Sequence, residues 1–215
     1  IDASDVTTAA NRIEVIGTHF GGGDSIVGSS GEDTIDGGAG NDTISGGAGN
    51  DVITGGVGVD ELTGGSGADV FNFSSSNNGL DTIKDFVRVD GDKLDFSSIT
   101  DQHDVYNSGT AVTEGSSGEI ALAAVNGRFV YFSVSDITTA DISEASLFGS
   151  GQEFAAEGTP SPLDFILAVG ETTGTDGVKI YQVFDGADPD DMTITQIGLI
   201  EGTSLADILS PNLIL

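Results

Sequence analysis

Six aspartates recur at intervals of nine residues, and each follows a glycine-rich segment. They are Asp24, Asp33, Asp42, Asp51, Asp60 and Asp69. A carboxylate offers oxygen atoms, and a glycine-rich turn can point backbone carbonyl oxygens in the same direction. Calcium is a hard cation that takes roughly 6–8 oxygen ligands of these two kinds. The spacing therefore predicts several calcium sites, and magnesium is disfavoured because it demands a tight octahedron and retains its waters.

The aspartates belong to a nine-residue repeat. Six consecutive units over residues 19–72 follow the pattern G-G-x-G-x-D-x-U-x, where U is a large apolar residue, and 27 of the 30 specified positions match. Clean units read GGAGNDTIS over residues 37–45 and GGVGVDELT over residues 55–63. The first two units deviate, because His19 and Phe20 replace two glycines and Ser29 and Ser30 follow Gly28. We expect the sites at that end to be incomplete or weaker.

The repeat also predicts the elements that position the aspartates. One unit cannot bury its single apolar residue alone, but stacked units can. We therefore predict an all-β protein, in which a right-handed parallel β-roll with two units per turn is followed by a β-rich C-terminal region. The segment G-G-x-G-x would form a turn and x-U-x a very short strand. The apolar residues would form two stacks, one of Ile26, Ile44 and Leu62 and the other of Ile35, Ile53 and Phe71.

In such a roll, the turn of one unit lies beside the turn two units later, so that one ion could lie between two aspartates. The predicted pairs are Asp24/Asp42, Asp33/Asp51, Asp42/Asp60 and Asp51/Asp69. Carbonyl oxygens of the turns would complete the sites, from Gly37, Gly40, Gly46, Gly49, Gly55, Gly58, Gly64 and Gly67. Without a cation, these stacked carboxylates would destabilise the roll by mutual repulsion.

The charge of the chain excludes several classes of partner. The 215 residues include 35 acidic and 6 basic residues, for a net charge of −29, and no Lys or Arg lies between Ile13 and Ile83. Nucleic acid and anionic membrane surfaces are disfavoured, because phosphate binding needs a basic patch. There is no cysteine for disulfides or Cys-ligated zinc. No apolar run reaches the roughly 18 residues of a transmembrane segment.

Catalytic motifs are missing from the sequence. It contains two histidines and no Trp, and neither H-E-x-x-H nor G-x-S-x-G occurs. A zinc-protease site or a His-based triad therefore lacks its residues. We expect no catalytic residues and no enzymatic activity in this chain.

The stretch after the repeats adds a second motif. It reads DTIKDF over residues 81–86 and DKLDF over residues 92–96. With the nonapeptides, this stretch resembles the calcium-binding β-roll of RTX proteins, known from serralysin-type proteases, S-layer proteins and adhesins. The resemblance implies that Asp81 helps to coordinate calcium at the end of the roll. For Asp85, Asp92 and Asp95 we prefer a role in turns and caps.

Three regions are predicted. Residues 1–18 form an N-terminal capping strand around residues 13–16, and residues 19–73 form the calcium β-roll, closed by the layer of Val70, Phe71 and Phe73. Residues 74–215 form a β-rich cap and secretion region, with strands over 128–134, 163–169, 178–184 and 193–200. Residues 141–147 would form a short helix or turn, residues 149–162 a loop, and the acidic segment 185–191 a solvated turn in preference to a cation site. The C-terminal sequence SLADILSPNLIL resembles an uncleaved type I secretion signal.

Two functions are compatible with these features. The first is a non-catalytic calcium-binding module of a larger secreted or cell-surface protein of the S-layer or adhesin type. It would fold on calcium binding outside the cell, with the type I secretion machinery as a partner and self-assembly or cell-surface polysaccharide as further possibilities. The alternative is an accessory C-terminal domain of a secreted RTX enzyme, a protease or lipase, whose catalytic part lies upstream.

Overall fold

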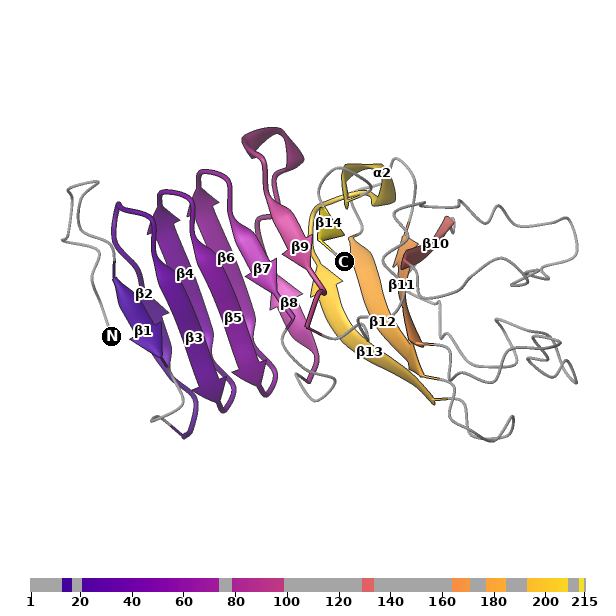
Figure 1. Cartoon of the computed structure of the whole chain (residues 1–215), viewed down its shortest axis with the longest axis horizontal. Helices are drawn as coiled ribbons and strands as arrows, with labels where there is room; N and C mark the ends of the chain where they lie inside the picture. Colours follow the sequence, from indigo (N-terminus) through magenta and orange to yellow (C-terminus); the bar gives the residue numbers. More distant parts are fainter. Residues whose placement is uncertain are drawn as a thin grey trace, which may run out of the picture.

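Two β-sheets wound from one chain make up most of the structure (Figure 1). The computed structural model describes residues 13–16, 21–73, 79–98, 129–133, 164–170, 177–184, 193–208 and 213–214. The first sheet has the order β1-β3-β5-β7-β9-β14 and the second β10-β11-β12-β13-β8-β6-β4-β2. The segments 141–147, 149–162 and 185–191, for which a helix or turn, a loop and a solvated turn are predicted, and His19 lie outside the described residues.

Successive strands of the repeat array alternate between the two sheets. The first sheet takes β1 (Glu14–Ile16), β3 (Thr34–Ala39), β5 (Val52–Val57) and β7 (Val70–Asn72). The second takes β2 (Ser25–Val27), β4 (Thr43–Ala48) and β6 (Glu61–Ser66). Neighbours within a sheet are parallel and 18 residues apart, with Ile35 opposite Ile53 and Ile44 opposite Leu62. Two nonapeptides per turn and the two predicted apolar stacks are therefore confirmed.

The strand predicted at the N-terminal end of the array is present. Strand β1 pairs in parallel with β3, placing Val15 opposite Ile35. Val15 is buried and belongs to the same apolar core as Ile35. The strand therefore covers the first turn of the roll, as predicted.

The strands of the clean repeats are twice as long as predicted. Each of β3 to β6 has six residues and follows the pattern x-U-x-G-G-x. The assignment of the whole segment G-G-x-G-x to a turn was wrong. Its first two glycines belong to the strand, and Gly38 is paired opposite Gly56. The φ angle of Gly56 is 106°, and a Cβ there would overlap the Gly38 carbonyl oxygen. Glycine is required at this bend for both its φ angle and its size.

The apolar position of each repeat fills the narrow space between the two sheets. All six of these side chains are at most 2% exposed: Ile26, Ile35, Ile44, Ile53, Leu62 and Phe71. Burial of one such side chain contributes roughly 1.5–3 kcal/mol. Because the strands alternate between the sheets, one residue in nine is enough to build a continuous core.

The roll continues beyond Phe73. Strand β8 (Asp81–Ile83) pairs with β6, and β9 (Lys93–Asp95) pairs with β7, placing Leu94 opposite Phe71. The rings of Phe73 and Phe96 stack with their centroids 4.8 Å apart. The prediction that residues 70–73 close the roll was therefore wrong, since Ile83 and Leu94 supply the apolar residues of a further turn.

The C-terminal strands extend both sheets of the roll. Strand β13 (Thr193–Ile200) pairs in parallel with β8, and β14 (Leu213–Ile214) pairs with β9. The second sheet then continues through β12 (Val178–Phe184), β11 (Asp164–Gly170) and β10 (Phe129–Ser133). Lys84 Nζ lies 3.2 Å from Glu201 Oε1 and 3.8 Å from Glu61 Oε1, which links this region to the repeats. All four strands predicted here are confirmed to within one residue at each end.

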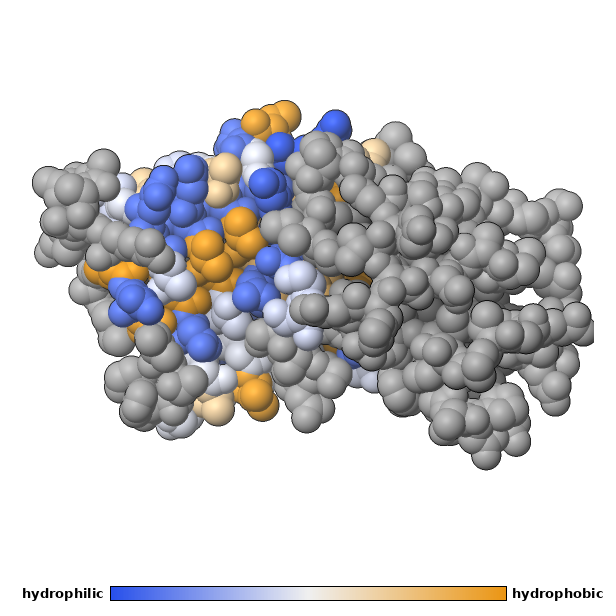
Figure 2. All heavy atoms as spheres, in the orientation of Figure 1, coloured by the Kyte–Doolittle hydropathy of each residue, from blue (hydrophilic) through white to orange (hydrophobic). Residues whose placement is uncertain are grey.

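Few large apolar side chains reach the surface of the described residues. Figure 2 shows apolar residues among hydrophilic neighbours on one face of the roll. The exposed large apolar residues are Val52, Val57, Val59, Leu80, Val87 and Val89.

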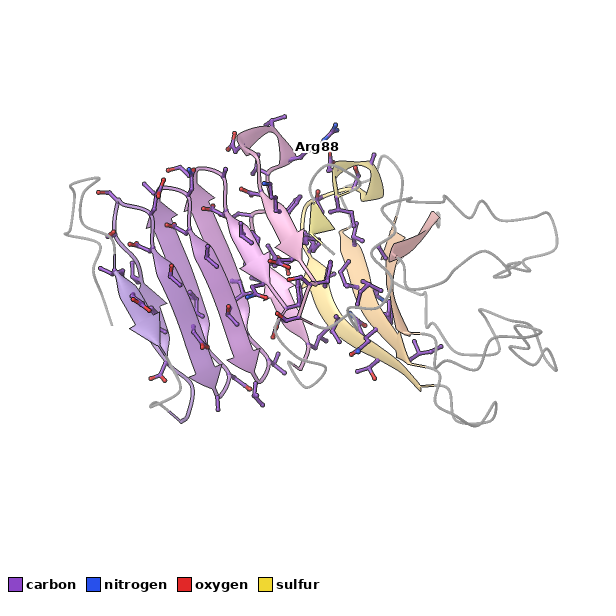
Figure 3. All side chains as sticks on the ribbon, in the orientation of Figure 1. Arg88 is labelled. Atoms are coloured by element: carbon purple, nitrogen blue, oxygen red, sulfur yellow. The ribbon has the colours of Figure 1, made fainter. Side chains whose placement is uncertain are left out.

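Arg88 extends outward from the short 3-10 helix η2 (Arg88–Asp90) (Figure 3). The only described α-helix, α2 (Leu205–Ile208), is far too short to span a membrane.

Candidate metal centre

The aspartates of the repeats form a ladder along each sheet. In four of them, the Oδ1 atom accepts a hydrogen bond from the main-chain amide of the aspartate 18 residues earlier. These distances are 2.7 Å for Asp24 to Asp42, 2.8 Å for Asp33 to Asp51, 2.8 Å for Asp42 to Asp60 and 2.9 Å for Asp51 to Asp69. The structure therefore brings together the members of all four predicted pairs.

Two aspartates beyond the repeats continue the ladders. Asp81 Oδ1 accepts from the amide of Asp60 at 3.1 Å, and Asp92 Oδ1 accepts from the amide of Asp69 at 3.0 Å. Asp92 Oδ2 also accepts from the amide of Val87 at 2.7 Å, as predicted for a capping residue. Its place in the ladder was missed, because it follows Asp69 by 23 residues and lies outside the nine-residue period.

The second carboxylate oxygen distinguishes five of the aspartates. Oδ2 is buried and has no hydrogen-bond partner in Asp24, Asp42, Asp51, Asp60 and Asp69. Asp51, Asp60 and Asp69 are 0% exposed as whole residues. A buried carboxylate without a compensating donor or cation costs several kcal/mol. Unpartnered anionic oxygens of this kind are suitable ligands for a metal cation.

Backbone carbonyl oxygens lie close to these carboxylates. A Cβ placed on Gly37 would be 2.5 Å from both Asp42 Oδ2 and the Gly55 carbonyl oxygen. The same relationship recurs at Gly46, beside Asp51 Oδ2 and the Gly64 carbonyl oxygen. A carboxylate and a carbonyl oxygen from adjacent turns thus face one small space, and this combination fits calcium.

The eight glycines predicted as ligands fall into two groups. The first glycines of the units lie against Oδ2 of the aspartate in their own unit: Gly37, Gly46, Gly55 and Gly64. The second group packs on the carbonyl oxygen of the preceding turn: Gly40, Gly49, Gly58 and Gly67. The space beside the aspartates is therefore bordered by the first group.

Side chains alone do not complete a metal site. Within the part of the chain that the structure describes, no three His, Asp or Glu side chains cluster so that they could hold a metal ion. A cation beside the ladder would therefore depend on the backbone carbonyl oxygens of the glycine-rich turns.

Burial raises the pKa of six of the ladder carboxyls. Burial, and then neighbouring acidic charges, raise the pKa of Asp51 and of Asp69 to about 6. The pKa of Asp81 is raised to about 8, first by burial and then by the charge of Asp60. Burial also raises the pKa values of Asp42, Asp60 and Asp92. In the metal-free roll, burial therefore shifts these six carboxyls towards the protonated form, and a cation would favour their ionised form.

Two further aspartates accept hydrogen bonds from turn amides. Asp85 accepts two hydrogen bonds, from the Gly64 amide at 2.8 Å and the Gly65 amide at 2.9 Å. Asp95 Oδ1 accepts from the amide of Ser97 at 2.9 Å. The predicted capping roles of Asp85 and Asp95 are confirmed.

Two asparagines that sequence reasoning missed link successive turns. Asn41 Oδ1 accepts from the Val59 amide at 3.0 Å, and Asn50 Oδ1 accepts from the Ala68 amide at 2.9 Å. Both precede the ladder aspartate in the sequence GGAGND. The recurrence of Asn at this position was the available signal.

One comparison with known proteins matches the repeat pattern. A family model of the RTX calcium-binding nonapeptide repeat, which spans four copies, matches residues 20–53, 37–71 and 45–83. No curated protein matches the chain. Among solved structures, the chain is similar to the solution structure of the AlgE6R3 subunit from the Azotobacter vinelandii mannuronan C5-epimerase. The sequence identity is 24% and the TM-score 0.47, over 90% of this chain and 78% of the other.

Proposed function

We propose that the chain is a non-catalytic module whose roll folds on binding several calcium ions, because a family model of the RTX calcium-binding repeat matches it over residues 20–83. The observation that supports this most directly is the set of five buried Oδ2 atoms without a partner. They lie in an array without Lys or Arg, in a chain with a net charge of −29. A divalent cation is the simplest group that neutralises them.

The proposed ligands are side-chain carboxylates and backbone carbonyl oxygens of the repeats. The carboxylates of Asp24, Asp42, Asp51, Asp60, Asp69 and Asp81 would bind the ions. Carbonyl oxygens of the glycine-rich turns would supply further ligands, including those of Gly55 and Gly64, each of which borders the same small space as an Oδ2 atom. Calcium would bring positive charge and satisfy the open oxygens, while the protein would hold the turns in register.

Calcium binding and folding would be one equilibrium. The unfolded chain has no preformed site, so the binding free energy stabilises only the folded roll. Calcium sites of extracellular modules have dissociation constants of about 10⁻⁴–10⁻³ M. We therefore propose that repulsion among the acidic residues keeps the array unfolded at cytosolic calcium concentrations and that it folds outside the cell.

A calcium titration of the purified chain tests this function. Far-ultraviolet circular dichroism should show a cooperative gain of β-structure at millimolar calcium, reversed by a chelator. Magnesium at the same concentration is the control for non-specific screening, and it should produce a much smaller change. A spectrum that is identical with calcium and with chelator would overturn the proposal.

We also propose the cellular setting of the module. It would be exported by a type I secretion system and act at the cell surface, in a protein of the S-layer or adhesin type. The residues that support export are those of the C-terminal sequence SLADILSPNLIL. Deletion of residues 204–215 should abolish export in a host that carries a type I system, whereas undiminished export would contradict this part of the proposal.

A further inference from the structure

Ser29 occupies a position where the clean repeats have glycine. In those repeats the second glycine has a positive φ: 96° for Gly38, 110° for Gly47, 106° for Gly56 and 104° for Gly65. No described residue other than glycine has a positive φ, so the backbone at Ser29 takes a different conformation. The turn before Asp33 therefore differs in structure from the clean turns.

This conformation directs donors of Ser29 at the carboxylate of Asp33. The Ser29 amide lies 2.6 Å from Asp33 Oδ2, and Ser29 Oγ lies 2.9 Å from Oδ2 and 3.0 Å from Oδ1. The Gly31 amide donates to Ser29 Oγ at 3.0 Å, which leaves the hydroxyl hydrogen to point at the carboxylate. Asp33 Oδ1 also accepts from the Ile13 amide at 2.8 Å.

Both carboxylate oxygens of Asp33 accept hydrogen bonds, whereas Oδ2 has no partner in the other five repeat aspartates. Asp33 is 1% exposed and Ser29 is 4% exposed, so the two residues meet away from solvent. The oxygen that lacks a donor in the other five repeats has two donors here. The hydrogen of the Ser29 amide, which cannot rotate away, carries partial positive charge and opposes a cation beside Asp33 Oδ2.

We infer that Ser29 replaces a calcium ion at the Asp33 turn, so that Asp33 binds no metal and the array holds one ion fewer than its aspartates suggest. This inference rests on the proposed calcium binding by the other turns. It identifies a specificity-determining residue in the array, because the choice between Gly and Ser at the second position decides between a calcium turn and a hydrogen-bonded turn.

The number of calcium ions per folded chain tests the inference. Ser29→Gly restores the repeat pattern and removes the hydroxyl, so it should bind one more ion than the wild type in native mass spectrometry or isothermal titration calorimetry. Ser66→Gly is the matched control, because Ser66 is exposed in β6 and is not at the second position. This control should bind the wild-type number.

A second pair of variants decides the question if Ser29→Gly does not fold. Asp33→Asn should keep the wild-type number of ions, whereas Asp51→Asn should lose at least one. The inference is overturned if folded Ser29→Gly binds the wild-type number of ions, or if Asp33→Asn loses one. A wild-type chain that binds no calcium would overturn the proposed function as well, so the two failures are distinguishable.

Discussion

The main-chain amide of Asp51 donates a hydrogen bond of 2.9 Å to Asp69 Oδ1, while Oδ2 of both residues is buried without a partner. Each carboxylate thus uses one oxygen to fix the register of adjacent turns and leaves the other open. The group that stabilises the stacking of the metal-free roll also carries an electrostatic penalty, because burial raises the pKa of both carboxyls to about 6. This dual use explains how folding and cation binding can depend on the same residues.

Replacing Asp51 should have opposite effects with and without calcium. A pKa of about 6 in place of 3.8 corresponds at neutral pH to a penalty of roughly 3 kcal/mol in the metal-free roll. Asp51→Asn keeps the Oδ1 acceptor and removes the charge, so it should stabilise the metal-free roll by up to about 3 kcal/mol. It should weaken calcium binding by at least about tenfold.

Two measurements separate these effects: the calcium concentration required for folding reports the weaker binding of Asp51→Asn, and the β-structure seen by circular dichroism in chelator reports its more stable metal-free roll. Glu14→Gln is the control, since it also removes one negative charge but lies exposed in β1. The control should change the calcium midpoint and the calcium-free β-content only slightly. A loss of β-structure for Asp51→Asn in chelator would contradict the role assigned to its open oxygen.

The metal-free roll should be more stable in mild acid than at neutral pH. The folded state holds protons more tightly than the unfolded state, because the pKa is raised to about 6 for Asp51 and Asp69 and to about 8 for Asp81. This stability is fully present below the ordinary carboxyl pKa of 3.8 and is lost as the pH rises through 6 and 8. Circular dichroism in calcium-free buffer should therefore show more β-structure at pH 5 than at pH 8.

Folding that is driven by calcium should have the opposite pH dependence. Calcium ligands must be deprotonated, so the calcium concentration required for folding should increase from pH 8 to pH 5. If the calcium-free chain shows the same β-content at both pH values, the carboxyls of the ladder do not control its stability.

Gly56→Ala should destabilise the roll whether or not calcium is present. Its φ of 106° is unfavourable for alanine, and the new Cβ would overlap the Gly38 carbonyl oxygen in the neighbouring strand. We expect a loss of at least about 2 kcal/mol in the free energy of unfolding. Gly21→Ala is the control, because nothing lies within 4 Å of the added Cβ and its φ is not positive. Equal denaturant midpoints for the two variants would refute this explanation.

Asp85→Ala should reduce stability without changing the number of bound calcium ions. The variant loses the two hydrogen bonds from the Gly64 and Gly65 amides, which we expect to cost roughly 1–3 kcal/mol. Asp90→Ala removes an exposed carboxylate close by in η2 and should have little effect. Chemical denaturation in saturating calcium measures the difference, and the loss of a calcium ion from Asp85→Ala would show that Asp85 is a ligand instead of a cap.

The sequence was sufficient for the features that repeat. A period of nine with one apolar residue per unit indicated two units per turn, and the stacks through Ile35 and Ile44 follow from that period. The same arithmetic placed Asp42 beside Asp60. These contacts could be predicted because each one recurs every 18 residues, so a single spacing determines them all.

Features that do not recur at a fixed spacing could be found only in the tertiary structure. Asp92 enters the ladder and β13 pairs with β8 across insertions of irregular length, which no spacing rule predicts. The sequence showed Ser29 only as a deviation, and the folded chain showed that its amide and hydroxyl face Asp33. The repeat by itself determined the roll, its core and the aspartate ladder. Only the tertiary structure decided which carboxylate oxygens remain open, because that depends on where individual backbone donors point.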